Sequence, residues 1–290
     1  MIGCNSDDSG DFSRVLLNDD FSMLDTGLFS IPLGAHAEYH YMPEVGIKGN
    51  WAVSSYRSAG GLRATGWAIA WQVNEDESGK TMDQTYFNSS YPSSHPMIIA
   101  GDSLWQDYKL TVSFRPENDS LSSGIAFRYR NDRQFYFFGI KNGEAYISKI
   151  DHGTGFRQLK EEVLAKMPYV LPSNQDLRAV VTVNGNSIKA ELGDNVILQV
   201  ADDYYSTGKI GLISNTPAKY KSVEVLTSKD EYNRIEYVRD LLEKELVELR
   251  KENPSMVLWK KINTEGFGVG RNLRFGDLDM DGEIDVLIGQ

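Results

Sequence analysis

The most restrictive feature of this sequence is a long series of short β-type segments between Val15 and Leu226. Each segment is rich in β-branched and aromatic residues and is bounded by Gly, Asn, Asp or Pro, as strands are. The clearest segments are 108–114, 124–130, 135–140, 144–150, 177–183, 187–192, 196–200 and 209–214. Many short strands separated by turns favour two antiparallel sheets packed face to face as a β-sandwich.

Two Asn-Gly pairs support antiparallel pairing. Asn142-Gly143 and Asn184-Gly185 each lie between two β-type segments. Both residues of a type I′ turn need a positive φ, which Asn and Gly adopt most easily. We therefore predict a type I′ hairpin turn at each pair.

The order of these segments resembles a concanavalin-A-like jelly roll of the laminin-G or glucanase type. The resemblance rests on Asn18-Asp19-Asp20-Phe21, on the stretch 123–130, and on 208–214 followed by Val223-Glu224-Val225. It implies an all-β fold and a surface that binds or cleaves carbohydrate in many families. A fold by itself does not decide the activity.

Residues 229–253 differ from the segments before them because they are rich in charge and have a helical period. The apolar residues at helical spacing are Ile235, Val238, Leu242, Leu246 and Leu249. We predict one amphipathic linker helix that ends before Pro254. A structural strut is our interpretation, and a partner-binding or coiled-coil helix is the alternative. The predicted domains are a disordered lipoprotein-type tail over 1–12, the sandwich over 13–228, this helix over 229–253, and a truncated repeat over 254–290.

An acidic loop near the C-terminus predicts a calcium site. Asp277, Asp279, Asp281 and Asp285 occupy loop positions 1, 3, 5 and 9, a glycine occupies position 6, and Glu283 would offer its backbone carbonyl at position 7. Ca²⁺ binds about six to eight oxygens, and clustered carboxylates without a cation repel one another. An acidic surface turn is the alternative. The site is not an EF-hand, because an isoleucine stands where a bidentate Glu is needed.

The stretch 275–286 resembles the FG-GAP (VCBS-type) repeat. The resemblance implies that this stretch is a fragment of the first blade of a β-propeller, with Ca²⁺ in its loop. A propeller has about four to eight blades, and one copy of the repeat is present. We therefore expect that the chain stops inside the propeller.

The N-terminus resembles the end of a bacterial lipoprotein signal. Cys4 is the only cysteine, and it follows a small residue and precedes an acidic tail, as in surface lipoproteins of Bacteroidetes. The resemblance implies that Cys4 is acylated and that the protein is anchored by lipid at the cell surface or in the periplasm of a Gram-negative bacterium. A chance cysteine in a disordered tail is the alternative.

Composition argues against nucleic acid as a partner and against a membrane-spanning segment. Acidic residues outnumber basic ones 41 to 30, which gives a net charge of −11, so nucleic acid is disfavoured. No run of apolar residues is long enough to span a membrane, so we expect contact with a membrane through the lipid anchor only.

Three groups of side chains are candidates for sugar contact. His36, Glu38 and His40 would share one face of a strand, where they could hydrogen-bond sugar, bind a metal or face solvent. Trp51, Trp67 and Trp71 could stack on sugar rings or pack in the core. Arg128 and Arg130 would share a strand face, where their guanidinium groups could hold a uronate carboxylate or be solvated.

The sequence contains no recognisable catalytic motif. It lacks a Glu-x-Asp-x-x-Glu stretch, a Gly-x-Ser-x-Gly elbow, a P-loop and a dinucleotide fingerprint. The combined architecture resembles the rhamnogalacturonan-lyase-like proteins that contain FG-GAP repeats. The resemblance implies that this chain is the N-terminal part of a secreted protein that degrades polysaccharide. This part would bind a polysaccharide or oligosaccharide, with acidic and pectic glycans among the candidates. It would not itself turn over the glycan. The alternatives are a calcium-dependent adhesion or scaffold protein and hydrolysis in the sandwich.

Overall fold

A computed structural model of the chain describes residues 11–29, 47–54, 70–89, 95–155, 158–253, 256–258 and 272–289. The chain divides into two compact units, residues 1–240 and 241–290. In the described part, no helix has the length and apolar character that a membrane crossing requires.

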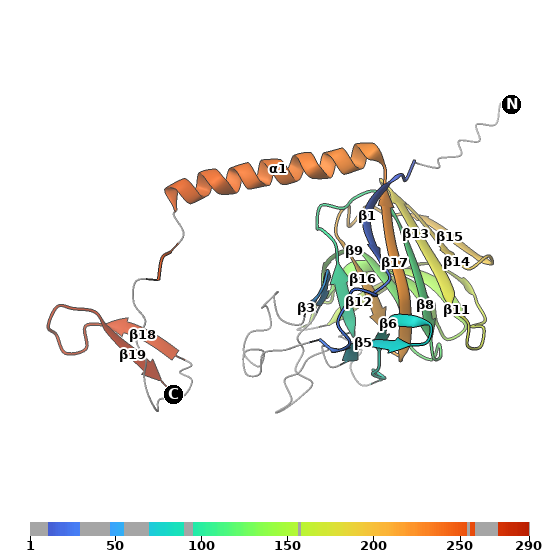
Figure 1. Ribbon diagram of the computed structural model, residues 1–290, viewed down its shortest axis with the longest axis horizontal. Helices are drawn as coiled ribbons and strands as arrows, with labels where there is room; N and C mark the ends of the chain where they lie inside the picture. Colours follow the sequence, from blue (N-terminus) through green and yellow to red (C-terminus); the bar gives the residue numbers. More distant parts are fainter. Residues whose placement is uncertain are drawn as a thin grey trace. The chain divides into compact units, whose positions relative to one another are not determined.

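The first unit contains a nine-stranded antiparallel sheet (Figure 1). Its strand order is β15 (Val196–Ala201), β14 (Ser187–Leu192), β13 (Leu177–Asn184), β8 (Tyr108–Pro116), β17 (Ala218–Thr227), β6 (Gly79–Gln84), β5 (Trp71–Asp76) and β2 (Gly27–Leu28). The ninth strand, β1 (Arg14–Asp19), also pairs with β17.

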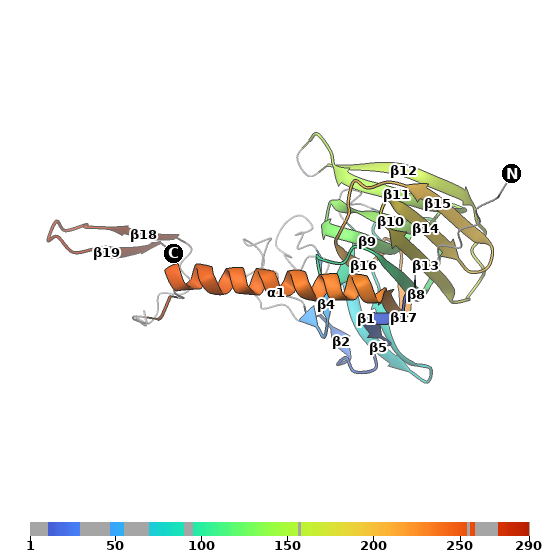
Figure 2. The same ribbon diagram turned by 90° about the horizontal axis from the view of Figure 1, so that it is seen from above.

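An eight-stranded antiparallel sheet forms the second layer (Figure 2). Its order is β12 (Leu159–Pro168), β11 (Glu144–His152), β10 (Gln134–Lys141), β9 (Ser123–Asn131), β16 (Lys209–Ser214), β7 (Met97–Ala100), β4 (Trp51–Val53) and β3 (Ile47–Lys48). Neighbours such as β9 and β16 are far apart in sequence, which is typical of a jelly roll.

The main core lies between the two sheets, because alternate residues of each strand face inward. In β8, the side chains of Tyr108, Leu110, Val112 and Phe114 are fully buried, and the residues between them are partly exposed. The predicted all-β sandwich of the jelly-roll type is therefore confirmed.

The eight-stranded sheet is apolar on its outer face as well. A second cluster of buried side chains lies there, separate from the main core: Met97, Ala126, Tyr129, Phe135, Phe137, Tyr146, Ile150 and Ile213. Strand β10 shows the reason, since Phe135 and Phe137 belong to this outer cluster while Tyr136 and Phe138 belong to the main core. An uninterrupted apolar strand is expected where both faces of a sheet are covered.

The two predicted hairpin turns differ. Asn142 and Gly143 have φ values of +50° and +77° and join β10 to β11, so this type I′ prediction is confirmed. At the second turn, Asn184 pairs with Ser187, so Gly185 and Asn186 are the central residues. The predicted position of this turn was therefore wrong by one residue. The first central residue, Gly185, has a φ of +57°, and a glycine at this position is typical of a type II′ turn.

The predicted linker helix is observed as α1 (Lys229–Glu252). The Ser228 Oγ atom accepts a hydrogen bond from the backbone N–H of Glu231 at 3.1 Å, which caps the first turn. Ile235 packs into the main core with 1% exposure.

The second unit contains a two-stranded antiparallel hairpin. β18 (Asn272–Gly276) pairs with β19 (Asp285–Gly289), and the acidic loop joins them. Phe275 and Val286 are paired in register, and both are more than half exposed. Isolated two-stranded hairpins are marginally stable in water.

Candidate functional site

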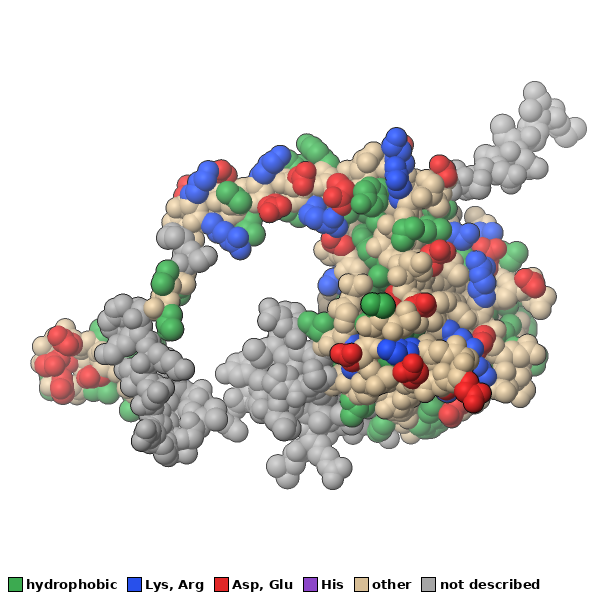
Figure 3. Space-filling model, viewed as in Figure 1, with side chains coloured by type: hydrophobic (Ala, Val, Ile, Leu, Met, Phe, Trp, Pro, Cys, Tyr) green, Lys and Arg blue, Asp and Glu red, His purple; other side chains and the backbone are tan. Residues whose placement is uncertain are grey.

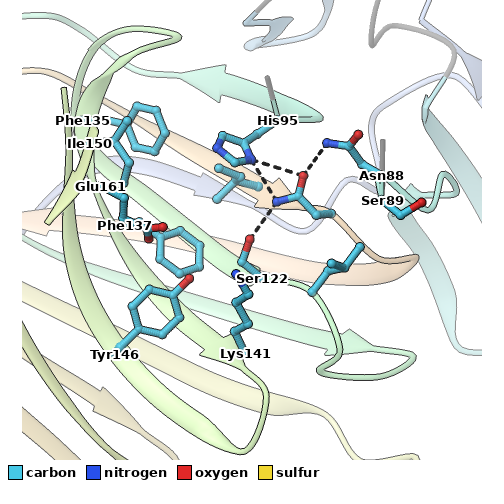
Figure 4. A pocket seen from close by; sticks show the side chains of 13 residues that line it. Asn88, Ser89, His95, Ser122, Phe135, Phe137, Lys141, Tyr146, Ile150 and Glu161 are labelled. Atoms are coloured by element: carbon cyan, nitrogen blue, oxygen red, sulfur yellow. Dashed lines mark hydrogen bonds between the residues drawn. The ribbon is translucent and has the colours of Figure 1, made fainter. Parts of the chain in front are cut away.

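A pocket of about 200 Å³ opens on the outer face of the eight-stranded sheet (Figure 4). Its polar lining comes from the ends of neighbouring strands. His95 precedes β7, Asn215 follows β16 and Ser122 precedes β9. Because β16 runs antiparallel to both neighbours, the start of β7, the end of β16 and the start of β9 lie at the same end of the sheet.

Asn215 is the centre of a hydrogen-bond network in this pocket. Its Oδ1 accepts a hydrogen bond from Asn88 Nδ2 at 2.7 Å, and its Nδ2 donates to Ser122 Oγ at 2.7 Å. Its backbone carbonyl also accepts a hydrogen bond from the backbone N–H of Asn88 at 2.8 Å. The Asn215 amide is only 5% exposed, so these bonds fix its orientation.

His95 completes the polar side of the pocket. Its Nδ1 atom lies 2.9 Å from Asn215 Nδ2 and 3.2 Å from Asn215 Oδ1. The shorter contact favours Nδ1 as acceptor, which places the ring proton on Nε2. Burial lowers the pKa of His95, and the hydrogen bond with Asn215 only partly opposes this effect. The ring is therefore neutral at pH 7 and carries one N–H donor.

An aromatic wall faces these polar groups (Figure 4). Phe135 and Phe137 come from β10 and Tyr146 from the adjacent β11, and the Phe137 and Tyr146 ring centroids are 5.1 Å apart. All three side chains are at most 6% exposed. The pocket thus has a rigid apolar wall and a polar wall on opposite sides.

Two glycines make room for this wall. Gly124 of β9 and Gly139 of β10 are paired in register. A Cβ atom on Gly139 would lie 2.5 Å from the Phe137 ring and 2.2 Å from the Ser123 carbonyl oxygen. The absence of a side chain at Gly139 therefore allows Phe137 to lie flat against the sheet.

Charged groups lie at the rim of the pocket. Lys141 ends β10 and is partly exposed, while Glu161 of β12 is exposed and accepts a hydrogen bond from Ser148 Oγ at 2.8 Å. Burial, together with the charge of Glu161, raises the pKa of Tyr146, so its hydroxyl stays protonated. The described lining of the pocket thus combines one cation, one anion and several neutral donors and acceptors.

The structure places Trp51 and Trp71 in the core and not in a binding surface. Both are fully buried. The Trp51 indole N–H donates a hydrogen bond to Asp19 Oδ2 at 2.9 Å, and the Trp71 ring centroid lies 5.8 Å from that of Tyr220. Of the two roles that the sequence left open for these residues, core packing is the one observed.

The predicted arrangement of Arg128 and Arg130 is wrong for Arg128. Its φ is +47°, and the register between β9 and β16 shifts at this point, so an extra residue forms a bulge. The bulge sends the Arg128 side chain inside, where its guanidinium donates to the carbonyls of Tyr205 (3.2 Å), Gln106 (3.2 Å) and Gly185 (2.7 Å).

Arg130 stays exposed, and its guanidinium carbon lies 5.3 Å from the centre of the Tyr205 ring. The two arginines therefore do not form one anion-binding face.

Several predicted site residues lie outside the described residues. They are His36, Glu38, His40, Trp67 and the predicted lipidation site Cys4.

The acidic loop brings three of its carboxylates together. Single oxygen atoms of Asp277, Asp279 and Asp285 all lie within 4.8 Å of one another. Asp281 is not a member of this group, and its Oδ1 accepts a hydrogen bond from the backbone N–H of Glu283 at 2.8 Å. Figure 3 shows acidic side chains gathered on this loop. Three clustered carboxylates on a loop form a donor set that suits a hard cation such as Ca²⁺.

Sequence reasoning missed every residue of the outer-face pocket. The run Phe135–Phe138 was the available signal, because four consecutive aromatic residues in a strand mean that both faces are buried. The polar residues carried no comparable signal, since His95, Ser122 and Asn215 are isolated in sequence.

Comparison with known proteins gives fold-level likeness. No protein-family model matches the chain, and no curated protein does. Carbohydrate-binding module CBM66 from Bacillus subtilis is 15% identical, with 61% of this chain and 96% of that chain covered and a TM-score of 0.45. LamAcat from Zobellia galactanivorans is 9% identical, with 74% and 98% covered and a TM-score of 0.44. A GH43B protein of Bacteroides ovatus is 12% identical, with 72% and 38% covered and a TM-score of 0.40.

Proposed function

We propose that the outer-face pocket binds a carbohydrate. The observation that carries the proposal is the fixed network of Asn88, His95, Ser122 and Asn215 opposite the aromatic wall. A sugar presents hydroxyl groups, which donate and accept hydrogen bonds, and apolar C–H faces, which pack against aromatic rings. The pocket offers a matching surface for each.

The pocket is organised before any ligand enters. Asn215 is held by three neighbouring side chains, so a ligand need not immobilise it. Binding to fixed groups costs less conformational entropy than binding to mobile side chains. Because Nδ1 of His95 faces Asn215, Nε2–H is the ring donor that a sugar hydroxyl can accept from.

The lining favours binding over hydrolysis. A glycosidase of the common type uses two carboxyl groups on either side of the scissile bond, about 5–10 Å apart. Among the described residues that line the pocket, Glu161 is the one carboxylate. The sequence left open hydrolysis within the sandwich. The described lining of this pocket offers one carboxylate, whereas that reaction needs two.

The test uses the full chain on an array of neutral, amino and acidic polysaccharides, with calorimetry on every glycan that is retained. We expect His95→Ala and Asn215→Ala to weaken binding at least about tenfold, because each removes a hydrogen bond and disturbs the orientation of the network. His152→Ala is the matched control, since His152 is exposed and lies outside the pocket. Thermal melting establishes that each variant is folded.

Two results would contradict the proposal. One is that no glycan binds the folded wild-type chain. The other is that a glycan binds the wild-type chain and both pocket variants equally well.

We further propose that the acidic loop binds Ca²⁺, as its spacing and the convergence of Asp277, Asp279 and Asp285 suggest. Calorimetric titration with Ca²⁺ should detect binding that Asp279→Ala abolishes. Glu283→Ala is the control, because only the backbone carbonyl of Glu283 is expected to serve as a ligand. Equal Ca²⁺ binding by Asp279→Ala and the wild-type chain would contradict this assignment.

A wider proposal concerns the parent protein. We infer that this chain is the N-terminal region of a lipid-anchored surface protein. That protein would degrade polysaccharide and would resemble rhamnogalacturonan lyases. The alternative is a calcium-dependent adhesion protein, which the Ca²⁺ loop would serve equally well. Incorporation of labelled fatty acid that is lost in Cys4→Ala would support the anchor, and labelling that persists in that variant would contradict it.

A further inference from the structure

We propose that the ligand of the outer-face pocket is an uncharged glycan and not a polyuronate. This inference rests on the proposed carbohydrate-binding function and narrows it to one chemical class. It differs from the acidic, pectic glycans that the sequence left among the candidates.

The fixed charges of the described residues that line the pocket cancel. Lys141 contributes one positive charge and Glu161 one negative charge, and both are at least partly exposed. A solvent-exposed ion pair changes an affinity by about fivefold at most. A uronate carboxylate placed near Lys141 would therefore gain little, and Glu161 would repel it.

The described arginines Arg128, Arg130 and Arg133 lie outside the pocket lining. Arg128 is fully buried and donates to three backbone carbonyls. Arg130 lies over the Tyr205 ring, and the Arg133 guanidinium Nε lies 4.0 Å from Asp132 Oδ1. Strong carboxylate recognition uses the paired N–H groups of an arginine, and the described residues that line this pocket include no arginine.

The net charge of the whole chain also disfavours the binding of a polyuronate. A net charge of −11 repels a polyanion at distances up to the Debye length, which is about 30 Å at 0.01 M salt and about 10 Å at 0.1 M. A neutral glycan meets no such barrier.

The groups that do face the pocket suit hydroxyls. The amides of Asn88 and Asn215, the Ser122 hydroxyl and the neutral His95 ring provide donors and acceptors without net charge. Such an array can satisfy a hydroxyl, which both donates and accepts. A carboxylate would lose hydration on entering, and this neutral set of groups brings no positive charge to offset that loss.

The experiment compares uronate polymers with their carboxyl-reduced neutral counterparts, together with every neutral glycan retained on the array. Affinities for the full chain are measured at 0.01, 0.1 and 0.3 M salt, for wild type and Lys141→Met. We expect the neutral member to bind at least about tenfold more tightly at low salt. The affinity for the neutral polymer should not depend on salt. The difference in affinity between the neutral polymer and the uronate polymer should decrease as salt screens the repulsion between the chain and the uronate.

The sign of the salt effect decides the result. Uronate binding that is tighter than neutral binding, weakens with salt and is lost in Lys141→Met overturns this inference and leaves the carbohydrate-binding function intact. Absence of binding to every glycan overturns the carbohydrate-binding function and this inference together.

Discussion

Replacing Arg128 with methionine tests the role of the bulge in β9. The Arg128 guanidinium is fully buried and donates to the carbonyls of Tyr205, Gln106 and Gly185, which lie on three different connections. Asp107, at 3.6 Å, is partly exposed and can be solvated by water when the arginine is lost. The main cost of the substitution is therefore the three carbonyls that lose their donor.

The magnitude follows from these contacts. Hydrogen bonds from a charged donor contribute about 1.5 kcal/mol each at the low end, so three contribute about 4.5 kcal/mol. Methionine fills part of the space and recovers about 1 kcal/mol of apolar burial. We expect Arg128→Met to lower the free energy of unfolding by about 3–4 kcal/mol, a large part of the stability of an ordinary domain.

Urea denaturation followed by tryptophan fluorescence measures this change. A loss of this size should lower the Tm by about 10 °C. Arg130→Met is the matched control, because Arg130 is exposed and contributes about 0.5–1 kcal/mol through its contact with Tyr205. The reasoning is refuted if the two variants lose the same stability, or if Arg128→Met loses less than about 1 kcal/mol. Either result would mean that water hydrogen-bonds the three carbonyls in place of the arginine.

Three further predictions concern the core, the pH response and calcium. Gly139→Ala should destabilise the sandwich by about 1–3 kcal/mol, because its Cβ would lie 2.2 Å from the Ser123 carbonyl oxygen; an unchanged Tm would contradict the close approach. Burial opposes ionisation of Asp202, but hydrogen bonds from Lys149 and its other neighbours outweigh burial and lower its pKa. Its contribution to stability should therefore be complete above about pH 4 and be lost as the pH falls through the folded pKa, a dependence that Asp202→Asn should flatten in urea titrations. Chelator should increase hydrogen exchange of residues 272–289, and exchange that is identical with and without Ca²⁺ would argue against a structural role for the ion.

The sequence by itself determined the parts of the fold that follow from local patterns. The strand segments, the Asn142-Gly143 turn and the helix near 229–253 have short periods or turn residues that act within a few positions. The loop spacing from Asp277 to Asp285 is equally local, and three of its carboxylates do converge.

The tertiary structure alone decided the pocket and the fate of the arginines. His95 and Ser122 lie 120 and 93 residues from Asn215, and only the order β7, β16, β9 brings them together. Arg128 was expected to alternate with its neighbours, but a one-residue bulge sent it inside, since strand alternation holds only while the register is unbroken. Pairing between distant strands fixes which side chains meet, and a single sequence does not state that pairing.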